Sequence, residues 1–177
     1  MGRSFKIFCT SKIQSSESTM EVFENAQVAN LYFSYKKSPD GYVLISDQIT
    51  WPENIISSIT LFSKQDYEWY SKPGFLGEGP ANFTISVFKN ENKLSPLEWV
   101  EANPLPSNFN IDQRSSVLPD KISNVDGITY SFPSLHLFDV HVFSYKEEIY
   151  LISATYYEVR DKYQTDFNEL ISTAFFK

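Results

Sequence analysis

The sequence predicts an α+β fold in which an antiparallel sheet is flanked by short helices. The 177 residues include 15 Phe, 11 Tyr and 3 Trp, and aromatic side chains favour strands and large buried cores. Several runs alternate apolar and polar residues between turn-forming residues, which is the pattern of strands with one buried face. Two other segments begin with a serine in the position of a helix cap. A chain of this length can bury a sufficient core without disulfide bonds, so we expect one domain.

The first part of the chain is more polar than the rest. Residues 15–19 read Ser-Ser-Glu-Ser-Thr, a composition that is typical of flexible linkers. We therefore expect a flexible tail or linker over residues 1–28 and a single α+β domain over residues 29–177.

The domain is expected to open with a β-hairpin. Residues 31–35 alternate between apolar and more polar side chains, and a second apolar run follows at Tyr42–Ile45. Between them lies Ser38-Pro39-Asp40-Gly41, a sequence with the residue types that tight turns require. This order predicts two antiparallel strands joined directly by the turn.

Two helices are predicted from their capping residues. Ser63 precedes a short helical segment with Asp66 at its third position, which is the arrangement of a serine cap. Ser95 is followed by a proline and, three residues after the cap, by Glu98, which together form the signature of a capping box. The polar, proline-containing residues 103–119 are expected to form a long loop.

The remaining regular elements are predicted from alternation, from turn signals or from one apolar helix face. They are strands over Ile55–Phe62 and Phe83–Phe88, a strand, tight turn and strand over Ile122–Tyr130 with the turn at Val125-Asp126-Gly127-Ile128, a hairpin of Val140–Tyr145 and Ile149–Tyr157, a helix over Asp166–Thr173, and a last strand over Ala174–Phe176.

Charge and cysteine content exclude several classes of partner. The formal net charge is −7 with a pI near 4.8, and the Lys and Arg residues are scattered singly. Nucleic acid and anionic membranes are therefore not expected as partners, because both require clustered positive charge. The single cysteine, Cys9, allows no intramolecular disulfide. No run approaches the roughly 18 apolar residues of a transmembrane helix, so membrane association is expected only through an anchor outside this chain.

Three segments carry a resemblance to a known family. They are the loop Gly77–Pro80, the capped helix start Ser95–Trp99 after the strand ending at Asn90, and the C-terminal order of the strand Ile149–Ile152 before Asp166-Phe167 and Ile171–Phe175. Together, residues 28 to 177 resemble the PsbP-like domains of bacterial secreted or membrane-anchored proteins.

The resemblance implies an α/β/α sandwich, an extracytoplasmic location and a non-catalytic role. The plant relative is an extrinsic subunit of photosystem II linked to calcium and manganese retention, and structural relatives bind partner proteins. No motif of this sequence matches a binding site of the family, so no functional residue is carried over. We expect no enzymatic activity and no bound cofactor.

The best candidate metal ligands are His136, Asp139 and His141. They contain the only two histidines of the chain, and two imidazoles with a carboxylate are suitable ligands for zinc. In a continuous strand Asp139 and His141 share a face, whereas His136 points to the opposite face unless the chain bends after Pro133. A metal-binding protein or a metal-dependent enzyme is therefore an alternative function.

Other catalytic signatures are missing from the sequence. There is no Gly-x-Ser-x-Gly elbow and no phosphate-binding loop with its lysine. The neighbouring carboxylates Glu147 and Glu148 are expected to be solvated, because adjacent residues of a strand or turn face apart. We therefore assign no catalytic residue.

Four aromatic residues are candidate partner-binding residues. They are Tyr67, Trp69 and Tyr70 of the first predicted helix and Phe75 of the loop that follows. Large aromatic side chains dominate the energy of many protein interfaces, although one face of this helix could instead pack on the sheet. The sequence thus predicts a non-enzymatic, extracytoplasmic accessory or binding domain that acts through a protein interface, with a binder of a small apolar ligand as a further alternative.

Overall fold

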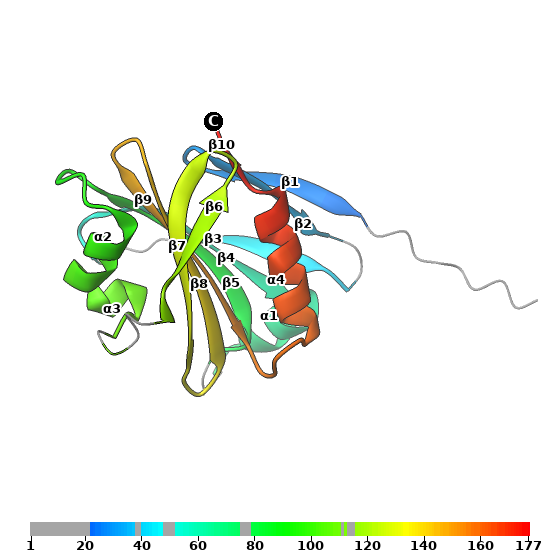
Figure 1. Cartoon of the computed structure of the whole chain (residues 1–177). Coiled ribbons are helices and arrows are strands. Elements are labelled where there is room, and N and C mark those ends of the chain that lie inside the picture. Colours follow the sequence, from blue (N-terminus) through cyan, green and yellow to red (C-terminus); the bar gives the residue numbers. More distant parts are fainter. Residues whose placement is uncertain (1–21, 38–39, 48–51, 75–78, 111, 113–115) are drawn as a thin grey trace, which may run out of the picture.

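A computed structural model gives the fold, and it describes residues 22–37, 40–47, 52–74, 79–110, 112 and 116–177. The strands are β1 (Phe23–Val28), β2 (Leu31–Lys36), β3 (Tyr42–Asp47), β4 (Ile55–Ser63), β5 (Asn82–Lys89), β6 (Leu118–Ile122), β7 (Val125–Pro133), β8 (Leu137–Tyr145), β9 (Glu148–Tyr156) and β10 (Phe175–Phe176). The helices are α1 (Lys64–Tyr70), α2 (Pro96–Ala102), α3 (Pro104–Ser107) and α4 (Lys162–Thr173). The α+β prediction is confirmed (Figure 1).

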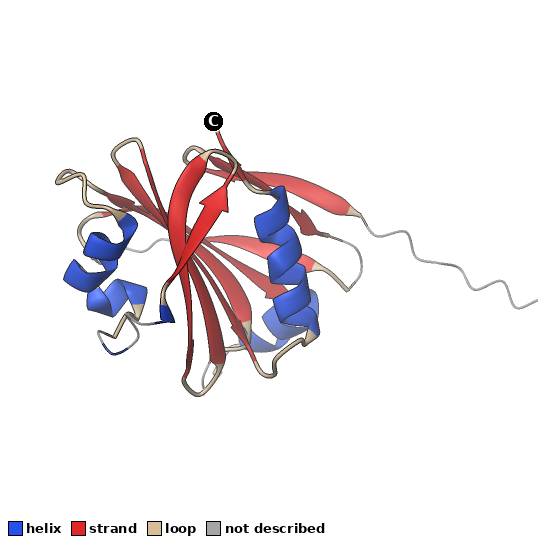
Figure 2. Ribbon diagram, viewed as in Figure 1, coloured by secondary structure: helices blue, strands red, loops and turns tan. Residues whose placement is uncertain are grey.

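The strands form a large and a small antiparallel sheet. The large sheet has seven strands in the order β3-β4-β5-β9-β8-β7-β6, and the small sheet has three strands in the order β1-β2-β10. In Figure 2 the strands of the large sheet fan out between α2 and α3 on one side and α4 on the other. The molecule therefore has three layers, and one outer layer combines a helix with the small sheet.

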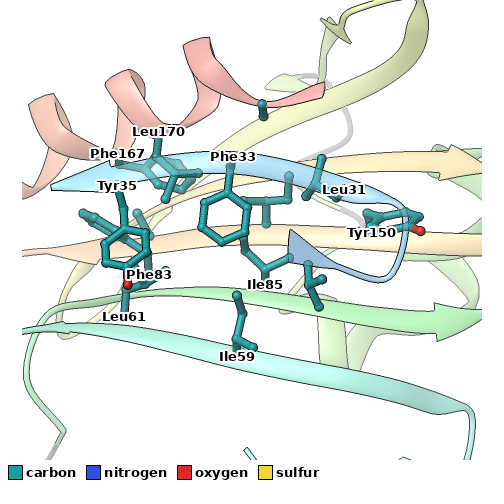
Figure 3. Packing of buried hydrophobic residues seen from close by; sticks show 14 of the residues in the cluster. Leu31, Phe33, Tyr35, Ile59, Leu61, Phe83, Ile85, Tyr150, Phe167 and Leu170 are labelled. Atoms are coloured by element: carbon teal, nitrogen blue, oxygen red, sulfur yellow. The ribbon is translucent and has the colours of Figure 1, made fainter. Parts of the chain in front are cut away.

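Each face of the large sheet carries its own hydrophobic core. One core lies beneath α4 and the small sheet, where Phe33 and Leu31 of β2 and Phe167 of α4 meet Ile85 of β5 and other strand residues (Figure 3). The second core lies beneath α2 and α3, around Trp99 and apolar strand residues. Strand alternation produces both cores, because successive side chains of β5, β8 and β9 point to opposite faces.

Local sequence signals place the starts of α1 and α2 as predicted. The hydroxyl of Ser63 accepts a hydrogen bond from the amide of Asp66 and caps α1. Ser95 and Glu98 form a complete capping box at the start of α2. Helix α4 begins four residues earlier than predicted, because Asp161 caps it by accepting from the amide of Gln164.

The predicted hairpin of residues 31–35 with Tyr42–Ile45 is wrong. Both strands exist, but β2 pairs with β1 and β10, whereas β3 pairs with β4. Alternate residues of β2 are buried in the core beneath the small sheet, so β2 lies across the large sheet instead of beside β3. The backbone carbonyl of Lys36 passes so close to Gly41 that a β-carbon there would lie 2.5 Å from its oxygen.

The predicted turn at Val125–Ile128 is also wrong. The chain turns between Ile122 and Val125, with Ser123 in the left-handed region at φ 53°. Gly127 lies inside β7, opposite Phe143 of β8. Its missing side chain makes room for the Phe143 ring and does not serve the turn.

Two further segments differ from the prediction. Residues 23–28, assigned to the tail, form β1, an edge strand whose polar residues face solvent and therefore resemble a linker in sequence. Part of the loop predicted over residues 103–119 forms α3, with Pro104 in its first turn, and the loop's last residues begin β6. Both elements are short and depend on tertiary packing.

Candidate functional site

Exposed hydrophobic side chains gather at one end of the large sheet. Helix α1, the turn between β7 and β8 and the loop between β9 and α4 all lie at the lower end of the molecule in Figure 1. The large hydrophobic residues there are Leu135 (79% exposed), Val159 (67%), Tyr157 (55%), Trp69 (51%) and Tyr70 (39%). We call these five residues the apolar end surface.

Helix α1 contributes aromatic residues that pack in part against the end of β4. Phe62, at the end of β4, stacks on Tyr70 and lies against Tyr67, with ring centroids 5.4 and 6.2 Å apart. No residue of α1 is fully buried, and about half of the Trp69 surface is exposed to solvent. Phe75, the fourth aromatic residue predicted to bind a partner, lies outside the described residues.

Tyr157 connects the two sides of the apolar end surface. Its hydroxyl accepts a hydrogen bond from the backbone amide of Ala81. The centroid of its ring lies 5.1 Å from that of His136 and 6.3 Å from that of Tyr163. Tyr163 in turn donates a hydrogen bond to Asp66 of α1. Burial and this carboxylate raise the pKa of Tyr163, so it stays a neutral donor. The loop before α4 is thereby fixed to α1.

The three predicted metal ligands point to separate partners. His136 lies before β8, against the ring of Tyr157. Asp139 accepts hydrogen bonds from Ser131 at 2.6 Å and from Gln164 at 3.1 Å. His141 pairs with Asp120 of β6, with 2.6 Å between Nδ1 and Oδ2. Among the described residues, no group of three His, Cys, Asp or Glu side chains is placed to bind a metal ion.

The pair of Asp120 and His141 was missed by sequence reasoning. The residues are 21 positions apart, and Asp120 lies directly after the segment expected to be a loop, so no local pattern linked them. Both side chains are largely buried, at 19% and 13% exposure, and His141 lies against the ring of Phe167 in α4. Burial opposes ionisation of Asp120, but the hydrogen bond and charge of His141 outweigh it and lower the pKa of Asp120.

A second charged cluster holds the small sheet on the large one. Asp166 of α4 is buried and binds Lys36 of β2 and the hydroxyl of Tyr42 in β3, both at 2.9 Å. Lys36 also pairs with Glu169 at 3.0 Å. Burial and the Asp166 carboxylate raise the pKa of Tyr42, which therefore remains a donor. Because every charge is paired, this cluster joins β2, β3 and α4 and has a structural role.

A groove opens beside the apolar end surface. It has a volume of about 440 Å³ and is lined by Ser131, Phe132, Pro133, Leu137, Phe138, Asp139, Tyr156, Val159 and Gln164. A neighbouring hollow of about 320 Å³ shares Phe138 and continues to Leu135, His136 and the segment Gly79–Pro80. The two hollows meet at Phe138, next to the β7–β8 turn. We call the first hollow the Asp139 groove.

Comparison with solved structures identifies the architecture. The solution structure of cyanobacterial PsbP from Synechocystis sp. PCC 6803 aligns with 92% of this chain and 97% of its own, with a TM-score of 0.57 and 9% sequence identity. The fold is PsbP-like. A crystal structure from Bacteroides thetaiotaomicron VPI-5482 is 16% identical, covers 82% of this chain and 45% of the other, and has a TM-score of 0.43.

The sequence itself matches no protein-family model and no curated protein. The likeness to the cyanobacterial protein is therefore one of fold alone. In the described part of this PsbP-like chain, no helix combines the length and apolar character needed to cross a membrane.

Proposed function

We propose that this chain is a non-enzymatic accessory domain that binds a partner protein through the apolar end surface. The observation that carries the proposal is the gathering of five exposed hydrophobic residues at one end of the sheet. Solvent-exposed hydrophobic groups that are contiguous and close to polar residues are typical of protein interaction sites. The PsbP-like fold supports an accessory role.

The surface has the composition of an interface centre. Trp69, Tyr70 and Tyr157 offer large, rigid side chains of the types that dominate binding energy when they are desolvated. Their backbone supports are fixed, since Phe62 lies beneath α1 and Tyr163 connects α1 to the loop before α4. A pre-organised surface loses little conformational entropy on association. The same arrangement favours recognition without large rearrangement.

Location and charge complete the proposal. The net charge of −7 favours a partner whose contact surface is neutral or basic, because like charges repel at an interface. We place the domain outside the cytoplasm, on the resemblance of its sequence to PsbP-like domains of secreted or membrane-anchored bacterial proteins.

The test compares matched surface substitutions in partner capture from the native host. Trp69→Ala and Leu135→Ser alter the apolar end surface, whereas Leu105→Ser changes a leucine of α3 whose exposure, 74%, is close to the 79% of Leu135. A partner captured by the wild-type chain is then purified and titrated with each variant. We expect Trp69→Ala and Leu135→Ser to weaken binding about tenfold or more, and Leu105→Ser to leave binding within about twofold.

The control decides how the result is read. If all three variants bind the same partner with wild-type affinity, the apolar end surface is not the interface and the proposal fails. Far-ultraviolet circular dichroism and thermal unfolding of each variant separate lost binding from lost folding.

A further inference from the structure

The Asp139 groove has an apolar lining that is suited to a bulky side chain. Phe132 of β7 and Phe138 of β8 stack with centroids 4.6 Å apart and an interplanar angle of 9°. Leu137, Pro133 and the exposed Val159 extend the apolar lining around them. Burying an aliphatic or aromatic side chain against such a lining removes apolar surface from water and therefore favours binding.

Asp139 brings a negative charge into this apolar lining. It is the one charged residue among those described as lining the groove, and it is partly buried. Its hydrogen-bond donors are the neutral groups of Ser131, Gln164 and Tyr156, and no Lys, Arg or His of the described residues forms an ion pair with it. A carboxylate has about four acceptor positions, so capacity remains for a further donor.

The surroundings of Asp139 are held in place from two elements. The side-chain amide of Gln164 donates both to Asp139 and to the hydroxyl of Tyr156. The backbone N–H of Arg160 in turn donates to the side-chain oxygen of Gln164. Burial and the Asp139 charge raise the pKa of Tyr156. The carboxylate is thus fixed between β8 and α4 before any ligand binds, which is the condition for strong charge recognition.

Among the described residues, the pairing of β7 with β6 ends before β7 reaches the groove. Strand β7 pairs with β6 only from Val125 to Thr129, whereas its pairing with β8 continues to Pro133. In the described part of the chain, Ser131 and Phe132 therefore have no partner strand on the β6 side. An unpaired edge offers backbone donors and acceptors to an extended segment.

We propose that the Asp139 groove binds an extended segment of the partner protein in which a Lys or Arg adjoins a bulky apolar residue. The apolar side chain occupies the lining around Phe132 and Phe138, and the cationic group pairs with Asp139. A partly desolvated carboxylate with neutral neighbours favours a cation over a neutral or acidic group, since the pair compensates the cost of burying the charge. This inference rests on the proposed function and names the chemistry of the partner.

The probe is a phage library of random 12-residue peptides selected on the immobilised chain. We expect selected clones to contain Lys or Arg next to Phe, Leu, Trp or a similar residue. The best clone is synthesised with a fluorophore, and its affinity is measured by anisotropy with wild type and with two variants. Asp139→Asn removes the charge of the groove, whereas Asp126→Asn removes an exposed carboxylate elsewhere on β7.

We expect Asp139→Asn to weaken peptide binding about tenfold, equivalent to about 1.4 kcal/mol, while Asp126→Asn changes it less than about twofold. A peptide with Gln in place of its basic residue should lose affinity for the wild type and no further affinity for Asp139→Asn, because the two groups form one pair. This double-mutant comparison remains valid if Asp139→Asn also lowers stability.

The outcomes separate this inference from the proposed function. Selected peptides without basic residues, equal binding by Asp139→Asn and wild type, self-association of the chain through the groove, or a selection that enriches nothing would each overturn the inference. The proposed function fails separately, when Trp69→Ala and Leu135→Ser retain the full affinity for the native partner.

Discussion

Gly127→Ala is expected to destabilise the protein, although most substitutions of this kind in a compatible backbone do the opposite. The backbone at Gly127 is not in the left-handed region, and there alanine normally stabilises by about 0.4–1 kcal/mol through the unfolded state. Here a β-carbon would lie 2.4 Å from a ring carbon of Phe143 and 2.5 Å from the carbonyl oxygen of Val142. The ring can rotate, but the carbonyl belongs to the backbone of β8, so β7 must shift.

The expected magnitude follows from this contact. Overpacking a well-filled core costs about 1–3 kcal/mol, which outweighs the gain in the unfolded state. We expect the free energy of unfolding to fall by about 2 kcal/mol and Tm by roughly 4–8 °C, at about 2–4 °C per kcal/mol for a chain of this size.

Urea unfolding followed by tryptophan fluorescence measures the effect. Gly79→Ala is the matched control, because the nearest heavy atom to its β-carbon would be Tyr70 Cε2 at an ordinary 3.9 Å. We expect Gly79→Ala to remain within about 0.5 kcal/mol of wild type. A Gly127→Ala protein as stable as wild type, or more stable, would refute the account of β7 packing against β8.

Two other substitutions test the packing of α4 and of β6. Phe167→Ala should lower the free energy of unfolding by about 3–5 kcal/mol, because Phe167 is completely buried against Phe83 and His141. Asn168→Ala, on the exposed side of α4, should change it little. Similar urea midpoints for the two variants would contradict this packing of α4. The lowered pKa of Asp120 means that its ionised form contributes stability above its ordinary pKa of 3.8, which is lost as pH falls through the folded pKa. Thermal unfolding between about pH 5 and 2 should therefore depend less on pH in Asp120→Asn than in wild type, and parallel curves would count against the pair with His141.

Local signals in the sequence were sufficient for the elements that depend on near neighbours. The capping box of Ser95 and Glu98 involves residues three positions apart, and it produces α2 as predicted. The hairpin of β8 and β9 was predicted from two apolar runs and a charged turn, and Lys146 adopts the left-handed conformation in that turn. In both cases the deciding contacts lie within a few residues of the signal.

Pairing between distant segments could not be predicted in the same way. The turn residues before Gly41 indicated a hairpin, but the core that buries β2 includes Phe167 and Leu170, which are far away in sequence. The Gly127 signal was ambiguous because a glycine serves a turn and a close approach equally well, and only the position of Phe143 distinguishes them.

The candidate site shows the same division. Trp69 and Tyr70 were identified because they are neighbours in one aromatic helix. Leu135 and Val159 enter the apolar end surface only through folding, which brings the β7–β8 turn next to the loop before α4. Asp139 was considered as a metal ligand because of its sequence neighbours, whereas the structure gives it the donors Ser131, Gln164 and Tyr156.

The position of β2 has a consequence for how the protein is made. Thr173 of α4 bonds both backbone groups of Ser34, across a separation of 139 residues, and Phe175 and Phe176 pair with Tyr32 and Leu31. During synthesis β2 therefore emerges from the ribosome long before the segments that cover its edge and its core face. Loops of this length close slowly and leave apolar surface exposed in the meantime. The small sheet can therefore be completed only after α4 and β10 have been synthesised.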